Sequence, residues 1–275
     1  LPAGLIAQVP DDYLNYVITI HGLNAFVEPV RATMVTGRVD ITSWMSAEDI
    51  DFIILATVTP DNTFPSCAAK ISKILGLRSG VAAMEINAAW SGFVYATQIA
   101  DNMIRLGQIK NALVIGAETL SRITDWTDRN TCVLFGDGAG AAIYKAAECE
   151  GKNTDTGILA TKIYADGAQY DKLCSDSGVS FNQKSGYIHM DGKEVFKVAV
   201  PSLVQGVEET LAIANVSIND VDWYIPHQAN SRIVEIVSRK LKVSIEKFYL
   251  NGREVEEKKI WLNGDGGMYE IEAEM

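Results

Sequence analysis

Cysteine, histidine and proline are scarce in this chain of 275 residues, which holds 4, 3 and 7 of them. So few prolines, with a hydrophobic share of 48%, exclude a disordered, collagen-like or low-complexity chain. The cysteines are too few for a disulfide scaffold and have no C-x-x-C spacing, so neither a disulfide framework nor a metal site is predicted. We therefore expect a reducing, cytoplasmic location.

Positive charge is also in deficit, because 24 Lys and Arg residues face 35 Asp and Glu residues, for a net charge of −11. This balance argues against general binding to nucleic acid or to an anionic membrane surface. The longest uncharged hydrophobic stretch, residues 86–100, is too short and too polar to cross a bilayer. No targeting or membrane-spanning segment is predicted.

Short apolar runs alternate with helical periodicity along the chain. Continuous apolar runs, which are typical of strands buried on both faces, predict strands at 50–58, 81–87, 112–118, 132–135, 141–144, 157–164 and 221–225. Apolar residues three and four apart predict helices at 66–77, 91–106, 193–214 and 231–241. Pro201 should kink the third helix or mark its start. The alternation predicts an α/β fold.

One segment recurs 171 residues further along the chain, where SAEDIDFII (46–54) resembles SINDVDWYI (217–225). Each copy has a capping serine, an acidic pair around an aliphatic residue and then a buried strand. Chance similarity is the alternative, since such a connection before a strand is common. A true duplication predicts two similar halves, residues 1–150 and 151–275, with the functional site in the cleft between them.

The glycine-rich segment FGDGAGA (135–141) lies between two predicted strands. A dinucleotide-binding loop requires a strand before the glycines and a helix after them. We therefore expect a tight hairpin or a close backbone approach here, not a phosphate site.

The segment MEINAAWSGF (84–93) passes from a predicted strand into a predicted helix and places Trp90 at the helix start. Backbone N–H groups at such a turn favour an anion, which makes it a position for a thiolate nucleophile. An indole cannot be a nucleophile, so the residues alone favour a buried aromatic side chain.

His227 follows the predicted strand VDWYI directly, within the segment PHQAN. The carboxyl ends of strands are where α/β proteins place reactive groups. A neutral imidazole there can transfer a proton or hydrogen-bond an oxyanion. A purely structural histidine is the alternative.

Five motifs, taken together, resemble the β-ketoacyl-acyl-carrier-protein synthase III family: LATVTPD (55–61), INAA-x-SGF (86–93), DWTDR (125–129), FGDGAG (135–140) and IPHQANSRI (225–233). The resemblance implies a thiolase-like fold of five α-β-α-β-α layers built from two duplicated halves, usually as a homodimer. It implies condensation of an acyl-CoA, commonly acetyl-CoA, with malonyl-acyl carrier protein, with loss of CO2 and without a cofactor, to initiate fatty-acid synthesis. In the family a cysteine carries the acyl group, and a histidine and an asparagine assist decarboxylation.

The resemblance also assigns roles to residues of this chain. His227 matches the family histidine, Phe196 an aromatic wall of the pocket and Arg129 a residue near the CoA adenine. Gly266 and Gly267 match the late glycine loop that supplies an oxyanion-hole N–H group. Basic positions near the carrier-protein dock are matched by Lys197, Arg232, Arg239 and Lys240, for which a solvated helix face is the alternative.

The sequence departs from the family pattern in three places. Trp90 occupies the cysteine position, and the segment with the catalytic asparagine is absent, so that Asn251 is a weak replacement. The CoA-binding N-terminal region is not recognisable in residues 1–44. The leading interpretation is a synthase III altered at position 90. The alternatives are a non-catalytic thiolase-fold partner subunit and a malonyl decarboxylase that uses His227.

Overall fold

The computed structural model describes residues 4–8, 45–153, 155, 157–227, 230–250 and 260–262. Its strands are β1 (Gly4–Gln8), β2 (Phe52–Ala56), β3 (Ala82–Ile86), β4 (Asn111–Thr119), β5 (Asp137–Cys149), β6 (Leu173–Ser175), β7 (Ile188–Met190), β8 (Trp223–Ile225) and β9 (Ile260–Leu262). Its α-helices are α1 (Cys67–Ile74), α2 (Gly92–Arg105), α3 (Val179–Asn182), α4 (Gly192–Ala214) and α5 (Ser231–Leu241). Asn251, Gly266 and Gly267 lie outside the described residues.

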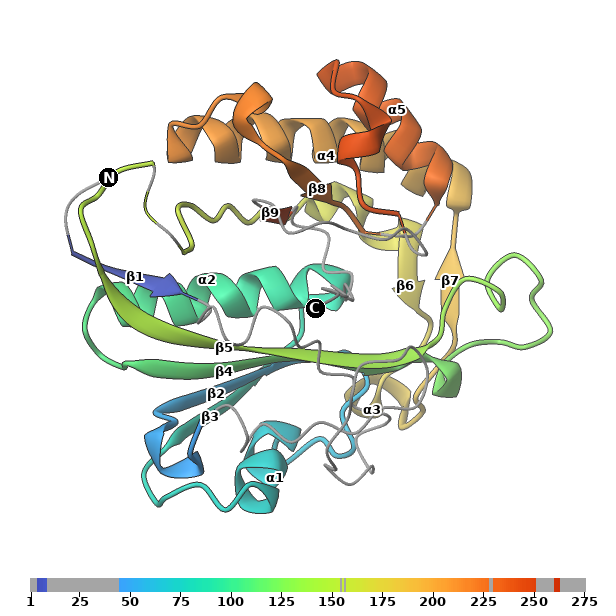
Figure 1. Ribbon diagram of the computed structural model, residues 1–275. Coiled ribbons are helices and arrows are strands. Elements are labelled where there is room, and N and C mark those ends of the chain that lie inside the picture. Colours follow the sequence, from blue (N-terminus) through green and yellow to red (C-terminus); the bar gives the residue numbers. More distant parts are fainter. Residues whose placement is uncertain are drawn as a thin grey trace.

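A five-stranded sheet in the order β1-β5-β4-β2-β3 organises the first half of the chain (Figure 1). The central strand β2 pairs in parallel with β3 and β4, and β5 pairs antiparallel with β4 and β1. Successive residues of β2 face opposite sides: Ile53 and Leu55 pack with α1, whereas Phe52 and Ile54 pack with α2. Because helices cover both faces, β2 and β4 are almost wholly buried and read as continuous apolar runs.

The second half forms its own core above α2. Side chains of α4 (Leu203, Val207), β8 (Tyr224) and α5 (Val234, Val237) pack together there. Figure 1 shows the resulting order of layers, from α1 through the large sheet and α2 to β8 with β9, and then to α4 with α5. This is the α-β-α-β-α order of a thiolase-like fold, and the predicted fold class is confirmed.

The two copies of the sequence repeat adopt the same local structure. Ser46 and Ser217 each cap a short 3-10 turn by accepting a hydrogen bond from the backbone N–H two residues on. The residue after each turn is extended, with φ/ψ of −74°/123° at Ile50 and −82°/123° at Val221. Each turn leads into a strand with parallel neighbours on both sides, β2 in the first half and β8 in the second. The repeat is therefore structural, while the exact boundary between residues 150 and 151 stays a prediction.

Two of the predicted strands are wrong. Residues 132–135 lie in a turn, where Val133 and Leu134 are 78% and 51% exposed. Residues 157–164, all of them described, contain no strand and instead run along α2 as a linker. Arg105 donates to the carbonyl of Ile158, and the Tyr95 hydroxyl donates to the carbonyl of Tyr164. A short apolar run does not by itself distinguish a strand from such a covering segment.

The glycine-rich segment is not a hairpin. Gly138 and Gly140 lie within β5, which pairs with β4 without interruption from Asp137 to Lys145. The backbone pairing of two long strands therefore overrides the turn preference of the glycines. Pro201 does not mark the start of α4, which is continuous from Gly192 to Ala214.

No helix in the described part of the chain is long and apolar enough to cross a membrane. Within those same residues, no cluster of His, Cys, Asp and Glu side chains could hold a metal ion.

Candidate active site

Trp90 lies in the tight turn between β3 and α2. The residue before it, Ala89, has a φ of 45°, in the left-handed region that non-glycine residues rarely adopt. Gly92, the first residue of α2, sits so close to β2 that a Cβ atom there would lie 2.7 Å from the Cβ of Ala56. A strained residue before Trp90 and an obligatory glycine after it produce a sharp turn that holds Trp90 at the start of the helix.

The indole of Trp90 packs against the ring of Phe135, with centroids 5.6 Å apart and an interplanar angle of 33°. Phe135 comes from the segment just before β5, and both residues are partly buried. Offset aromatic pairs of this kind stabilise a fold beyond their area of contact. The predicted aromatic residue at this helix start is thus part of the packing, and it offers neither a thiol nor a hydroxyl.

His227 lies directly after β8, as the sequence predicts. Burial lowers the pKa of His227 to about 4, so the imidazole is neutral near pH 7. Its Nδ1 atom is buried, and none of the described residues hydrogen-bonds it. The buried polar atoms of Gln98, Asn111 and Trp223 are in the same state, so this nitrogen does not by itself distinguish His227 from a packed side chain.

Two further predicted residues lie on different elements. Phe196 is the fifth residue of α4 and packs, partly buried, against the core of the second half. Arg129 is exposed in the loop before β5. That loop is shaped by Asp125, whose carboxylate accepts hydrogen bonds from the hydroxyl and the backbone N–H of Thr127. These bonds lower the pKa of Asp125, and the ordered turn presents Arg129 to solvent.

The predicted basic residues lie on the two outer helices of the second half. Arg232, Arg239 and Lys240 are exposed on α5. Lys197 is exposed on α4 and forms an ion pair with Glu194, which raises the pKa of Lys197. The more open basic surface is therefore that of α5.

Sequence reasoning missed a partly buried carboxylate, Glu118, near the end of β4. It accepts hydrogen bonds from the backbone N–H of Val58 at 2.9 Å and from the hydroxyls of Thr57 and Thr59 at 3.3 and 2.8 Å. Burial raises the pKa of Glu118, while these hydrogen bonds oppose the shift. One feature of the sequence could have indicated Glu118: it is the single acidic residue of the apolar segment ALVIGAE (112–118) and stands at its carboxyl end. Parallel strands place functional groups at that end.

The chain matches two family models in succession. Residues 84–167 match 3-oxoacyl-[acyl-carrier-protein] synthase III, and residues 211–255 match the C-terminal part of the same enzyme. In the structure of 3-oxoacyl-[acyl-carrier-protein] synthase III from Aquifex aeolicus, 35% of the aligned residues are identical, with a TM-score of 0.70. That alignment covers 96% of this chain and 86% of the other. The chain belongs to the β-ketoacyl-acyl-carrier-protein synthase III family.

Curated members of this synthase III family are more similar still, over a shorter span. The β-ketoacyl-[acyl-carrier-protein] synthase III of Paramagnetospirillum magneticum is 50% identical over 206 residues, and that of Rhodospirillum centenum is 54% identical over 199 residues. These alignments cover 75% and 72% of this chain but only 63% and 61% of the relatives. A priming β-ketosynthase from a polyketide pathway shares the fold, with a TM-score of 0.72 at 23% identity.

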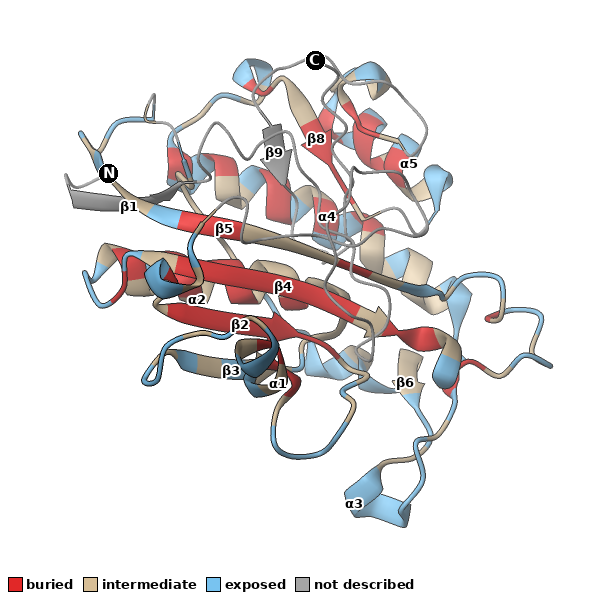
Figure 2. Ribbon diagram, turned by 60° about the horizontal axis from the view of Figure 1, so that its bottom comes forward, coloured by how far each residue is buried: buried red, intermediate tan, exposed pale blue. Residues whose placement is uncertain are grey.

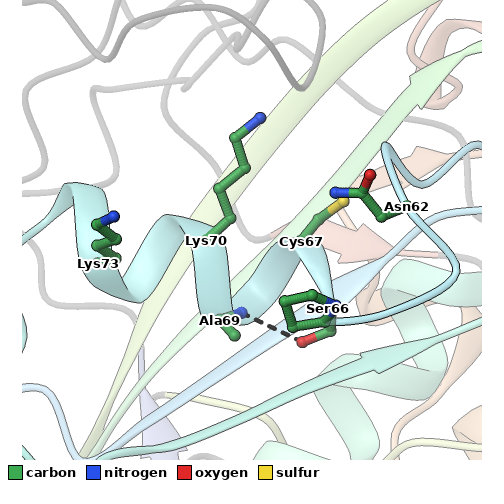
Figure 3. Close-up of a pocket in the computed structure, with 7 residues that line it drawn as sticks. Asn62, Ser66, Cys67, Ala69, Lys70 and Lys73 are labelled. Carbon is green, nitrogen blue, oxygen red and sulfur yellow. Dashed lines mark hydrogen bonds between the residues drawn. The ribbon is translucent and has the colours of Figure 1, made fainter.

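Cys67 lines a pocket, but it cannot take the place of the nucleophilic cysteine of the synthase III family. Figure 3 shows a pocket at the start of α1, lined by Ser66, Cys67 and Lys70 among others. This helix covers the face of the sheet opposite to α2. Burial raises the pKa of Cys67, and its Sγ atom accepts a hydrogen bond from the N–H of Asp61. A protonated, buried thiol is a poor nucleophile.

Proposed function

We propose that the protein acts in the reaction for which its family is named, at the start of fatty-acid synthesis. The reaction is a decarboxylative Claisen condensation of an acyl-CoA, with acetyl-CoA as the expected primer, and malonyl-acyl carrier protein. It consumes only these substrates and needs no cofactor. The observation that carries the proposal is His227, a neutral and desolvated imidazole at the end of β8 in a chain of this family.

The proposed role of His227 is to stabilise the enolate that forms as CO2 leaves the malonyl thioester. Negative charge then develops on the thioester oxygen, and a neutral imidazole can donate a hydrogen bond to it. Such a bond is stronger in a desolvated site than in water, because the local dielectric constant is low. Asn251 is proposed as a second donor to the same oxygen.

The remaining substrate contacts are proposed by family resemblance. Phe196 forms one wall of the acyl pocket, Arg129 lies toward the CoA adenine, and Gly266 and Gly267 supply the oxyanion-hole loop. Arg232, Arg239, Lys240 and Lys197 dock the acidic carrier protein, since opposite charges speed and orient association.

Acyl transfer from CoA requires a thiolate at the start of α2, and Trp90 stands there instead. We propose that the chain with Trp90 forms no acyl-enzyme. Its remaining chemistry is then malonyl decarboxylation at His227, or a role as the non-catalytic partner of an active synthase. The specific observation for this second candidate is that the sharp turn at Ala89 and Gly92 is present while the thiol is not.

A direct test compares the native chain with Trp90→Cys, and with Trp90→Ser as a matched control of similar size. After incubation with radiolabelled acetyl-CoA, we expect stoichiometric label on Trp90→Cys and none on the other two. An unlabelled Trp90→Cys protein with native circular dichroism would contradict the proposal. Release of labelled CO2 from malonyl-carrier protein, lost in His227→Ala, would identify the decarboxylase.

We further propose a homodimer in the cytoplasm. Strand β3 is an edge strand, and Figure 2 shows exposed and partly buried residues along it. Met84, on this strand, is 40% exposed. Exposed sheet edges are normally covered, and a second copy would cover this one. Cys67, Cys132 and Cys174 form no disulfide in the structure, which fits a reducing compartment. Sedimentation of the native chain would measure the dimer.

A further inference from the structure

We infer that Glu118 is a positioning residue for the turn that carries Trp90. Glu118 lies on β4, whereas the turn lies between β3 and α2, so the carboxylate must act through another segment. That segment is residues 56–59, the end of β2 and the loop that follows it. The geometric part of this inference stands on the contacts alone, and its consequence for acyl transfer rests on the proposed function.

The hydrogen bonds around Glu118 have a fixed direction. The Thr57 hydroxyl accepts the N–H of Thr59 at 3.1 Å, and the Thr59 hydroxyl accepts the N–H of Thr119 at 2.8 Å. Each hydroxyl therefore directs its single proton to Oε2 of Glu118. The N–H of Val58 donates to Oε1 and Oε2 at 2.9 and 3.1 Å.

The two threonine hydroxyls and the N–H of Val58 all donate hydrogen bonds to the carboxylate of Glu118. Both carboxylate oxygens must therefore act as acceptors. An amide of the same shape would place its NH2 group against a donor at one of the two positions. At the Oε2 position the NH2 group would face both threonine hydroxyls, and at the Oε1 position it would face the N–H of Val58, which keeps only its longer bond to Oε2. Either placement weakens the partly buried hydrogen bonds that hold the loop, and the loop would move to relieve it. Glu118→Gln is therefore a nearly isosteric change that releases the loop.

The loop held by Glu118 touches both ends of the Trp90 turn. The N–H of Thr57 donates to the carbonyl of Ile86, the last residue of β3, at 3.0 Å. Ala56 lies directly against Gly92, the first residue of α2, at a distance that leaves no room for a Cβ atom. A shift of residues 56 and 57 must therefore move the start and the end of the turn, and Trp90 with them.

The first experiment measures the position of Trp90 in the turn by fluorine NMR and does not depend on enzymatic activity. The full chain is labelled with 5-fluorotryptophan, and the Trp90 signal among its 5 tryptophans is assigned with Trp90→Phe. Asp101→Asn is the matched control, because Asp101 is a buried carboxylate near the other end of α2, paired with Arg105. We expect Glu118→Gln to shift or broaden the Trp90 fluorine resonance and Asp101→Asn to leave it in place at a comparable loss of Tm. An unmoved resonance in Glu118→Gln, or an equal shift in both variants, would overturn the inference.

The second experiment repeats both changes in the Trp90→Cys background. Because misplacement of a reacting group slows chemistry more than binding, we expect Glu118→Gln to lower the acylation rate about tenfold with little change in KM for acetyl-CoA. Asp101→Asn should change neither. If Trp90→Cys takes no label at all, the proposed function fails while the fluorine result still decides the role of Glu118.

Should Glu118→Gln fail to fold, Thr57→Val serves as the second variant, because it leaves the carboxylate in place and removes the longest of its hydrogen bonds together with the acceptor of the Thr59 N–H. A smaller displacement of the Trp90 resonance is then the expected result. An unmoved resonance in Thr57→Val would count against the inference.

Discussion

The desolvated state of His227 predicts a defined loss of stability in acid. The folded pKa is about 4, lowered from 6.5 by burial, so the folded protein binds this proton less tightly than the unfolded chain does. Above pH 6.5 neither state is protonated at this residue, and the burial costs nothing there. As the pH falls from 6.5 toward 4, only the unfolded chain takes up the proton, and the free energy of unfolding decreases. The gap between the two pKa values corresponds to about 3 kcal/mol, reached near pH 4.

The variant that isolates this effect is His227→Gln, which is neutral at every pH. Urea unfolding is measured from pH 7.5 to pH 4 for the native chain and for the variant. We expect the stability of the native chain relative to His227→Gln to fall by about 3 kcal/mol across this range. His189→Gln is the comparison for an exposed histidine, since the His189 side chain is 55% accessible and contacts the exposed carboxylate of Asp176 at 3.1 Å, and it should not reproduce this fall.

An NMR titration of the histidine ring protons provides an independent measurement. The His227 signal should stay in the position of a neutral ring until the pH falls below about 5. Equal pH slopes for the native chain and His227→Gln, or a His227 midpoint near 6.5, would show that the ring is hydrated. The proposed role as a desolvated donor to an enolate would then lose its physical basis.

Two further predictions concern glycines. Gly92→Ala should lower the free energy of unfolding by about 1–3 kcal/mol, because the added Cβ atom would lie 2.7 Å from the Cβ of Ala56. The loss is expected although alanine is the better helix former. In a double-mutant cycle measured by denaturation, adding Ala56→Gly should recover most of the loss. A fully stable Gly92→Ala protein would refute the close approach. Gly186→Ala should lower Tm more than Gly76→Ala, because both have positive φ (77° and 66°) but only Gly186 is crowded by neighbouring atoms. Equal melting temperatures would show that backbone strain alone decides the cost.

Much of the fold could be predicted because its elements carry their own local patterns. The strand at 52–56 is a continuous apolar run, and the helix at 231–241 has a clear amphipathic period after the capping side chain of Asn230. The predictions failed where a pattern was short or where pairing overrode it. Residues 132–135 are apolar but exposed, and the glycines at 138 and 140 lie inside a strand because β4 pairs with them.

The sequence identified the chemical groups of the candidate site but not the environment of those groups in the fold. The segment PHQAN after a strand pointed to His227, and the strand-to-helix turn pointed to position 90. Neither motif shows how far the imidazole of His227 is desolvated. Nor does either show that the indole of Trp90 packs against Phe135, which lies 45 residues away in the sequence. Glu118 was missed because its donors lie about 60 positions earlier in the chain, at Thr57, Val58 and Thr59.

The sequence by itself determined which chemical groups this protein has: a histidine after a buried strand, no thiol at position 90, and a repeated connection that builds two similar halves. Only the tertiary structure decided the state of those groups. A pKa depends on solvent exclusion by surrounding elements, and the direction of a hydrogen bond depends on donors brought together by the sheet. The pKa and the hydrogen-bond pattern both depend on residues that are distant in the chain. No local sequence pattern therefore encodes the desolvation of His227 or the three donors that bind Glu118.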